Sequence, residues 1–167
     1  MAPYILVPIL VLTVLVQTAF FSQISLLGVK PDLVLIAAAV WAVMRGVKEG
    51  ALWVILGGLL VDLFSGAPLG KGIIALTPVL LLAMAAQVVE VESGFLLSLG
   101  VVFLSAFFYE IVSRLILQAQ MIWWHSVLWV ALPAALVNTV LTPPVYGALH
   151  HLRTRSAPVK GITFTRE

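Results

Sequence analysis

The chain has 167 residues, of which 62% are hydrophobic and only 10% are charged, and its mean hydropathy is +1.17. Soluble domains average about 45–50% apolar and about 25% charged residues, so this composition excludes an ordinary soluble domain. The absence of cysteine excludes disulfides, thiolate catalysis and cysteine metal sites. The net charge of +2 comes from a basic tail, which is typical of a segment that sets membrane orientation and meets anionic lipid, and we expect no nucleic-acid partner.

Hydropathy divides the chain into six apolar segments, separated by short polar or glycine-rich stretches. Since a membrane-spanning helix needs about 20 residues, these segments use almost the whole chain and leave no room for a soluble catalytic domain. We expect an all-α membrane protein with about six transmembrane helices in one compact bundle over residues 1–152, and a basic cytoplasmic tail without fixed structure over 153–167. The expected helices cover roughly 4–21, 33–47, 51–64, 73–89, 95–117 and 127–149.

The second segment is the weakest candidate for a span. Its uninterrupted apolar run, 33–44, gives about 18 Å of helix against a hydrocarbon core of about 30 Å. If it spans, both termini are cytoplasmic, and the lysines and arginines of the loops and tail lie mostly inside, as the positive-inside rule expects. If it is re-entrant, five spans remain and the N-terminus moves outside.

One carboxylate, Asp62, interrupts the third apolar segment. An aspartate near the centre of a membrane helix costs about 2.5–3.5 kcal/mol on insertion scales, so it needs a partner or a role. Glu110 and Arg114, on the fifth segment, lie at a similar expected depth, and their i, i+4 spacing suits an ion pair. Two interpretations stay open: a self-neutralised Glu110–Arg114 pair with a separate Asp62, or a cluster in which Arg114 serves both carboxylates and lines a cavity or a partner's docking face.

The residues around Asp62 predict close packing and a tight turn. Gly58 lies one helical turn before it, and Gly66, Pro68 and Gly70 follow it. Glycine permits positive φ and proline fixes φ near −65°, so this run indicates a defined turn at the end of the third helix. The region is also a candidate contact surface for a partner.

Small and polar residues mark other candidate packing sites. Ala38, Ala42, Gly46 and Gly50 recur every four residues and predict a smooth face on the second helix, either for packing within the protein or for a partner's helix. In the sixth segment, Asn138 can hydrogen-bond across helices, and Pro143 with its neighbouring proline is expected to kink the helix.

The sequence carries no recognisable enzyme signature. Its three histidines form no HExxH motif, and the glycine-rich turn lacks the serine or threonine that follows the lysine of a P-loop. We therefore expect no catalytic activity, no cofactor and no metal site.

Three sets of residues resemble the bacterial rod shape-determining MreD proteins. They are the Lys30-Pro31-Asp32-Leu33 entry to the second helix followed by Gly46 and Gly50, then Gly57-Gly58-Leu-Leu-Val-Asp62 with its Ser65-Gly66-Ala-Pro68-Leu-Gly70 turn, and the closing Pro133, Asn138 and Pro143. Size, number of apolar segments and basic tail also fit, so the resemblance covers nearly the whole chain.

The resemblance implies a non-catalytic scaffold of the cell-elongation machinery in the bacterial inner membrane. MreD proteins associate with the bitopic protein MreC and, through it, with the elongation transpeptidase, the SEDS-type glycosyltransferase and cytoplasmic MreB filaments. An alternative is the substrate-binding membrane subunit of an energy-coupling-factor vitamin transporter, whose ligand pocket the outer charges could line. The bulky first helix lacks the small-residue motif with which such subunits commonly dock, which disfavours that alternative.

Overall fold

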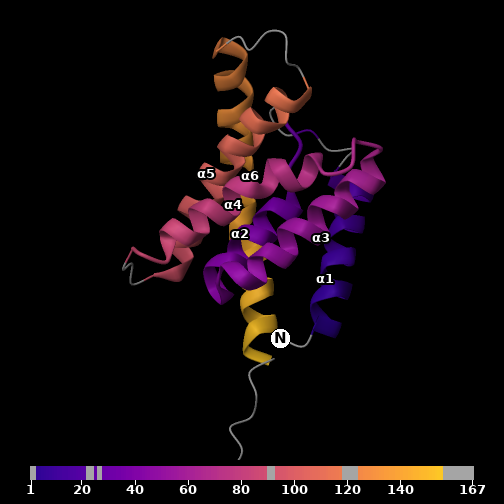
Figure 1. Ribbon diagram of the computed structural model, residues 1–167. Helices are drawn as coiled ribbons and strands as arrows, with labels where there is room; N and C mark the ends of the chain where they lie inside the picture. Colours follow the sequence, from indigo (N-terminus) through magenta and orange to yellow (C-terminus); the bar gives the residue numbers. More distant parts are fainter. Residues whose placement is uncertain (1–2, 22–24, 26–27, 90–92, 118–123, 156–167) are drawn as a thin grey trace, which may run out of the picture.

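The computed structural model describes residues 3–21, 25, 28–89, 93–117 and 124–155, and within these ranges the chain is helical and contains no β-strand. Six α-helices and one π-helical turn follow one another, so the expected all-α class is confirmed (Figure 1). The elements are α1 (Pro3–Val16), η1 (Gln17–Phe21), α2 (Leu33–Arg45), α3 (Val47–Ser65), α4 (Lys71–Ala86), α5 (Gly94–Leu117) and α6 (Trp124–Arg155).

The short helix α2 is the centre of the bundle. Every residue from Val34 to Ala42 is buried, on all sides of the helix, and α2 packs against each of the other five α-helices. A helix that is apolar all round is a buried helix, because no face is reserved for solvent. Its 13 residues, about 20 Å long, are therefore surrounded by protein rather than by lipid.

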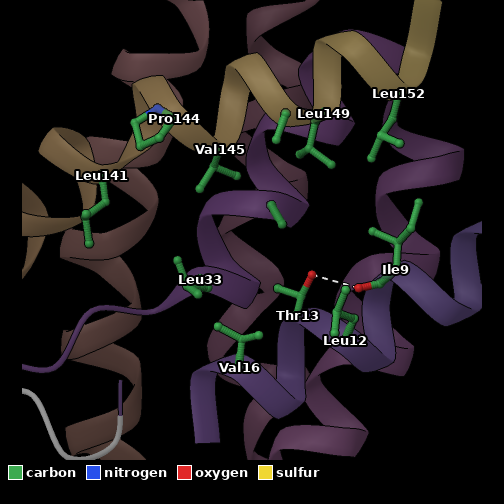
Figure 2. A pocket seen from close by; sticks show the side chains of 12 residues that line it. Ile9, Leu12, Thr13, Val16, Leu33, Leu141, Pro144, Val145, Leu149 and Leu152 are labelled. Carbon is green, nitrogen blue, oxygen red and sulfur yellow. Dashed lines mark hydrogen bonds between the residues drawn. The ribbon is translucent and has the colours of Figure 1, made fainter. Parts of the chain in front are cut away.

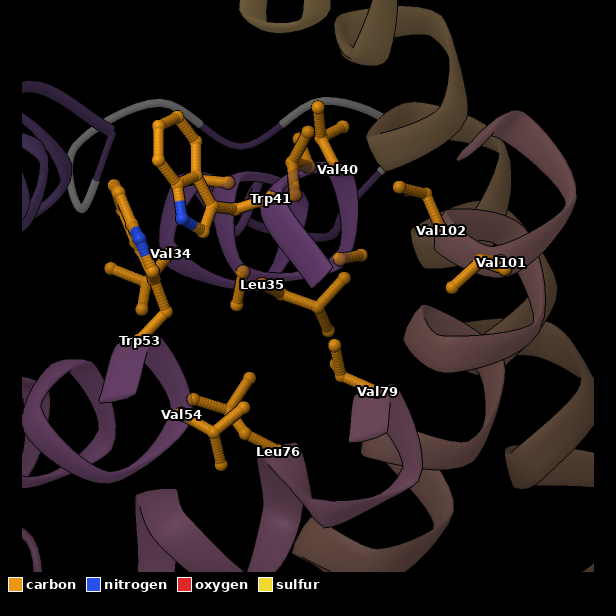
Figure 3. Packing of buried hydrophobic residues seen from close by; sticks show 14 of the residues in the cluster. Val34, Leu35, Val40, Trp41, Trp53, Val54, Leu76, Val79, Val101 and Val102 are labelled. Atoms are coloured by element: carbon orange, nitrogen blue, oxygen red, sulfur yellow. The ribbon is translucent and has the colours of Figure 1, made fainter. Parts of the chain in front are cut away.

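Two tryptophans join α2 to α3 within this core. The rings of Trp41 and Trp53 lie 6.0 Å apart between centroids, and each residue is only 1% exposed. Val54 from α3 and Val79 from α4 extend the same cluster toward the other helices (Figure 3). The core is thus one continuous aliphatic and aromatic cluster to which all six α-helices contribute residues.

The outer surface of the bundle is also apolar. Leu12 on α1, Leu81 on α4 and Val140 on α6 are 62%, 63% and 75% exposed. Two helices, over Gly94–Ile116 and Leu128–Thr154, are long and apolar enough to cross a membrane. Large apolar side chains that face outward on several helices fit contact with lipid better than contact with water.

The prediction of one small-residue face along the second helix is wrong, because α2 ends at Arg45, before the last two residues of that predicted face. Gly46, with φ of +96°, breaks the helix after Arg45, and Gly50 already belongs to α3. Ala42 and Gly50 nevertheless meet across this corner: a Cβ on Gly50 would lie 2.4 Å from the Ala42 Cβ. Since Ala38 and Ala42 are fully buried, these small residues serve packing within the protein.

Helix α6 runs without interruption from Trp124 to Arg155, through Pro133, Pro143 and Pro144. It therefore extends three residues into the stretch that was expected to be an unstructured tail. The rest of that tail lies outside the described residues.

Candidate functional site

Asp62 binds the beginning of the next helix along the chain. Its buried carboxylate, 2% exposed, accepts hydrogen bonds from the Gly70 amide at 2.8 Å and from the Gly72 amide at 2.9 and 3.0 Å. The first amides of a helix have no partner within the helix, and Gly70 offers no side chain to cap α4. Asp62 therefore caps α4 from α3, and its negative charge meets the positive end of the helix dipole.

The glycines around Asp62 make this contact possible. Gly66 and Gly70 have φ of +67° and +92°, which confirms the expected turn with left-handed residues on both sides of Pro68. Gly58 packs directly on the α4 backbone: a Cβ there would lie 2.7 Å from the Ile73 nitrogen. A Cβ on Gly72 would lie 2.6 Å from the Gly58 carbonyl oxygen. The motif thus brings two backbones into contact.

Of the three charges expected to cluster, the structure pairs two. The Nε of Arg114 lies 3.8 Å from the Oε2 of Glu110, which confirms the ion pair within α5. Within the described part of the chain, Arg114 forms no ion pair with Asp62, whose carboxylate is bound to α4 instead. The arrangement therefore corresponds to the simpler of the two interpretations.

A second polar assembly holds the beginning of α2. The Asp32 carboxylate accepts from the Leu35 amide at 2.9 Å, and the Gln17 side-chain oxygen accepts from the Val34 amide at 2.8 Å. The Asp32 amide itself donates to the Asn138 side-chain oxygen at 2.8 Å, which confirms the expected hydrogen bond from α6 to another part of the bundle. Side chains from η1, from the N-cap residue Asp32 and from α6 thus satisfy three amides at this end.

Sequence reasoning did not identify Asp32 and Gln17 as site residues. An aspartate directly before a long apolar run is a helix N-cap signal, and it could have found Asp32. No comparable signal exists for Gln17, because its role depends on the tertiary packing of η1 against α2.

These capping residues line a polar cavity of about 410 Å³. Its walls also include Lys30, Tyr109 and Glu110, and Figure 1 shows α5 and α6, which supply Tyr109 and Asn138, running alongside α2. Burial raises the pKa of the Asp32 carboxyl above its usual range, while hydrogen bonds from the Leu35 amide and from the Gln17 and Tyr109 side chains oppose that rise. The cavity therefore concentrates polar groups of both signs at one end of the bundle.

A second cavity, of about 400 Å³, is an apolar groove between α1 and α6. The floor is formed by α2 through Leu33 and Ala37. Figure 2 shows side chains of α6, among them Val145 and Leu149, pointing across the groove toward Thr13 and Leu12 of α1. The Thr13 hydroxyl donates to the Ile9 carbonyl at 2.8 Å and so presents little polarity to the groove.

Among the described residues, no group of three histidine or acidic side chains is placed to hold a metal ion. The fold and the two cavities define an all-helical protein with helices able to cross a membrane and with separate polar and apolar recesses. Comparison with protein-family models, with curated proteins and with solved structures finds no match for this chain.

Proposed function

We propose that this protein is a non-catalytic scaffold in the bacterial inner membrane, and that its apolar groove receives the single transmembrane helix of a partner. On the resemblance of its sequence to the MreD proteins, that partner is the bitopic protein MreC. Through it the chain joins the elongation transpeptidase, the SEDS-type glycosyltransferase and MreB filaments in peptidoglycan synthesis. In this proposal all six α-helices belong to the membrane domain and both termini are cytoplasmic.

The groove is the observation that carries the proposal. On α6 it is lined by Leu141, Val145, Leu149 and Leu152, at spacings of four, four and three residues, which form one stripe along about 17 Å of helix. A matching stripe from Ile9 to Val16 faces it from α1. An elongated apolar recess between two helices accommodates another helix that lies along it.

Two alanines favour a helical occupant over loosely packed lipid. Ala37 in the floor and Ala148 in the α6 wall leave room for the backbone of a partner to approach. Lipid gives no hydrophobic drive to helix association, so close contact at small residues supplies much of the affinity.

The conspicuous carboxylate Asp62 is not available to a partner in this scheme. Because it is buried and bound to two α4 amides, its contribution is to shape the scaffold. The same holds for Ala38 and Ala42, which are buried in the core. The proposed contact surface therefore shifts from the Asp62 region to the α1–α6 groove.

Site-specific photocrosslinking in native membranes tests the proposal. A photoreactive amino acid at Leu12, in the groove, is expected to capture a single-span protein that mass spectrometry identifies. The same amino acid at Leu81, which is equally exposed on α4 but outside the groove, serves as the matched control. Capture of the same protein from both positions, or of none from Leu12, would contradict docking in the groove.

A pair of substitutions on α6 provides a second test. Ala148→Trp fills the groove, whereas Val140→Trp places the same bulk on a strongly exposed position of the same helix. Only Ala148→Trp is expected to abolish co-purification of the partner in mild detergent. Recovery of an ATPase and a coupling subunit in place of a single-span protein would favour the vitamin-transporter alternative.

A further inference from the structure

The polar cavity at the beginning of α2 has carboxylates in its walls and a cation on an exposed position. Asp32 and Glu110 come from different elements, and both are only partly accessible. Lys30 is exposed and lines the same cavity. Within the described part of the chain Lys30 forms no ion pair with either carboxylate, so the opposite charges do not neutralise one another directly.

Glu110 is the cavity group with unused bonding capacity. Its side chain is 24% exposed, and its carboxylate accepts no hydrogen bond from any described residue. Its one ion pair, to the Nε of Arg114, is 3.8 Å long, and that Nε is itself without a hydrogen-bond partner among the described residues. An ionised carboxylate can accept about four hydrogen bonds, and one withdrawn from water is costly when these are missing.

Asp32 retains less capacity toward the cavity than Glu110. Its carboxylate accepts hydrogen bonds from the Leu35 amide and from the Gln17 and Tyr109 side chains, and a carboxylate offers about four acceptor sites in all, so about one remains. Gln17 uses its side-chain oxygen on the Val34 amide and its NH₂ group on Asp32, whereas Asn138 uses its side-chain oxygen on the Asp32 amide and keeps its NH₂ group as a donor beside the carboxylates. The cavity therefore offers acceptors for a cation together with a small number of neutral donors.

From this arrangement we infer that the cavity binds an aminoalkyl phosphate, a small zwitterion with a primary ammonium group and a phosphate. The ammonium lies between Asp32 and Glu110 and donates to both carboxylates. The phosphate lies toward Lys30, which meets its charge at the exposed side of the cavity. Pockets for small ligands start at about 300 Å³, so a volume of about 410 Å³ suits a group of this size.

Two sources carry this chemistry: the headgroup of phosphatidylethanolamine and a free aminoalkyl phosphate. The inference does not depend on the scaffold proposal, since the cavity and the apolar groove share no lining residue. If no partner is captured from the groove, the inference about the polar cavity is unaffected. If the cavity binds no aminoalkyl phosphate, the scaffold proposal is likewise unaffected.

Native mass spectrometry of the full chain in detergent tests the site. The chain is titrated with phosphatidylethanolamine, phosphatidylcholine and phosphatidylglycerol that have identical acyl chains. Phosphatidylcholine keeps the positive charge but has no N–H donor, and phosphatidylglycerol has no cation. We expect binding of phosphatidylethanolamine to be about tenfold tighter than binding of either, the ratio set by one hydrogen bond to a charged group.

Variants assign the preference to the cavity. Glu110→Gln is expected to remove it, while the control Glu49→Gln keeps it. Glu49 is also in an i, i+4 pair, 3.5 Å from Arg45, but it lies outside the cavity. Circular dichroism verifies the fold of both variants. Should Glu110→Gln not fold, Lys30→Gln replaces an exposed side chain and is expected to weaken binding of all three lipids about equally, since all carry a phosphate.

Competition with soluble O-phosphoethanolamine identifies the source, since displacement of the lipid supports a free ligand and retention supports the lipid headgroup. Equal binding of the three lipids, or a preference that persists in folded Glu110→Gln, would overturn the inference.

Discussion

Replacing Asp62 by alanine removes both acceptors at the beginning of α4. The Gly70 and Gly72 amides then have no partner, because the surrounding positions are glycine and packed backbone. The Gly72 amide is buried, and a buried amide left without an acceptor costs about 1–3 kcal/mol, while the partly exposed Gly70 amide adds a smaller loss. The free energy of unfolding of a typical protein is about 5–15 kcal/mol, so this loss is a large fraction of the total stability.

Asp62→Asn is expected to cost less than the alanine variant. One oxygen remains to accept a hydrogen bond, and the variant no longer buries a charge, but the new NH₂ group faces an amide donor. Ser65→Ala is a neighbouring control: the Ser65 hydroxyl reaches only the Asp62 carbonyl, at 3.5 Å, so its removal is expected to change stability by less than about 0.5 kcal/mol.

Unfolding by sodium dodecyl sulfate in mixed micelles, followed by circular dichroism, measures the change in free energy. Hydrogen exchange provides a local readout, since exchange at Gly70 and Gly72 is expected to accelerate more than exchange in α5. A folded Asp62→Ala protein within about 0.5 kcal/mol of the parent, with unchanged exchange at these amides, would refute the capping role.

A double-mutant cycle separates this role from the shared charge cluster. If Arg114 acts only through Glu110, the effects of Asp62→Ala and Arg114→Ala add within about 0.5 kcal/mol. A clearly larger coupling energy would support the cluster.

Three further substitutions test close packing and capping, each by the same unfolding measurement. Gly58→Ala is expected to destabilise by more than about 1 kcal/mol because its Cβ would meet the α4 backbone, whereas Gly100→Ala, with open space around it, gains about 1 kcal/mol of helix propensity. Asn138→Ala is expected to cost about 1–3 kcal/mol, since the Asp32 amide loses its acceptor. Gly50→Ala is expected to destabilise through its clash with Ala42, and Ala42→Gly in the same chain to recover part of the loss. Equal stabilities of the Gly58 and Gly100 variants, an Asn138 variant as stable as the parent, or no recovery by Ala42→Gly would each contradict the corresponding contact.

The order and approximate bounds of the six α-helices could be predicted from the sequence because composition and hydropathy mark each of them. The turn from Gly66 to Gly70 was equally readable, since glycine and proline restrict the backbone locally. What the sequence did not indicate is that α2 lies inside the bundle. A short apolar segment has the same local pattern whether lipid or protein surrounds it.

In the candidate site, too, local contacts could be predicted from the sequence, whereas contacts that depend on tertiary packing were missed. The Glu110–Arg114 pair followed from helical spacing alone, and the ability of Asn138 to reach another helix followed from its amide. The partner of Asp62 was missed because depth along a helix says nothing of which neighbour the side chain faces. The small-residue face was wrongly predicted because a glycine such as Gly46 can end a helix as well as provide a small residue on its surface.

The manner in which α2 is anchored has a consequence for biosynthesis. Its first amides are held by Gln17, made early, and by Asn138, which leaves the ribosome 106 residues after Asp32. Until α6 is synthesised and packed, the central helix lacks one of its anchors and one of the five α-helices that it packs against. We therefore expect α2 to reach its final position late, after the last helix enters, so that chains truncated before α6 remain incompletely assembled and open to membrane proteases.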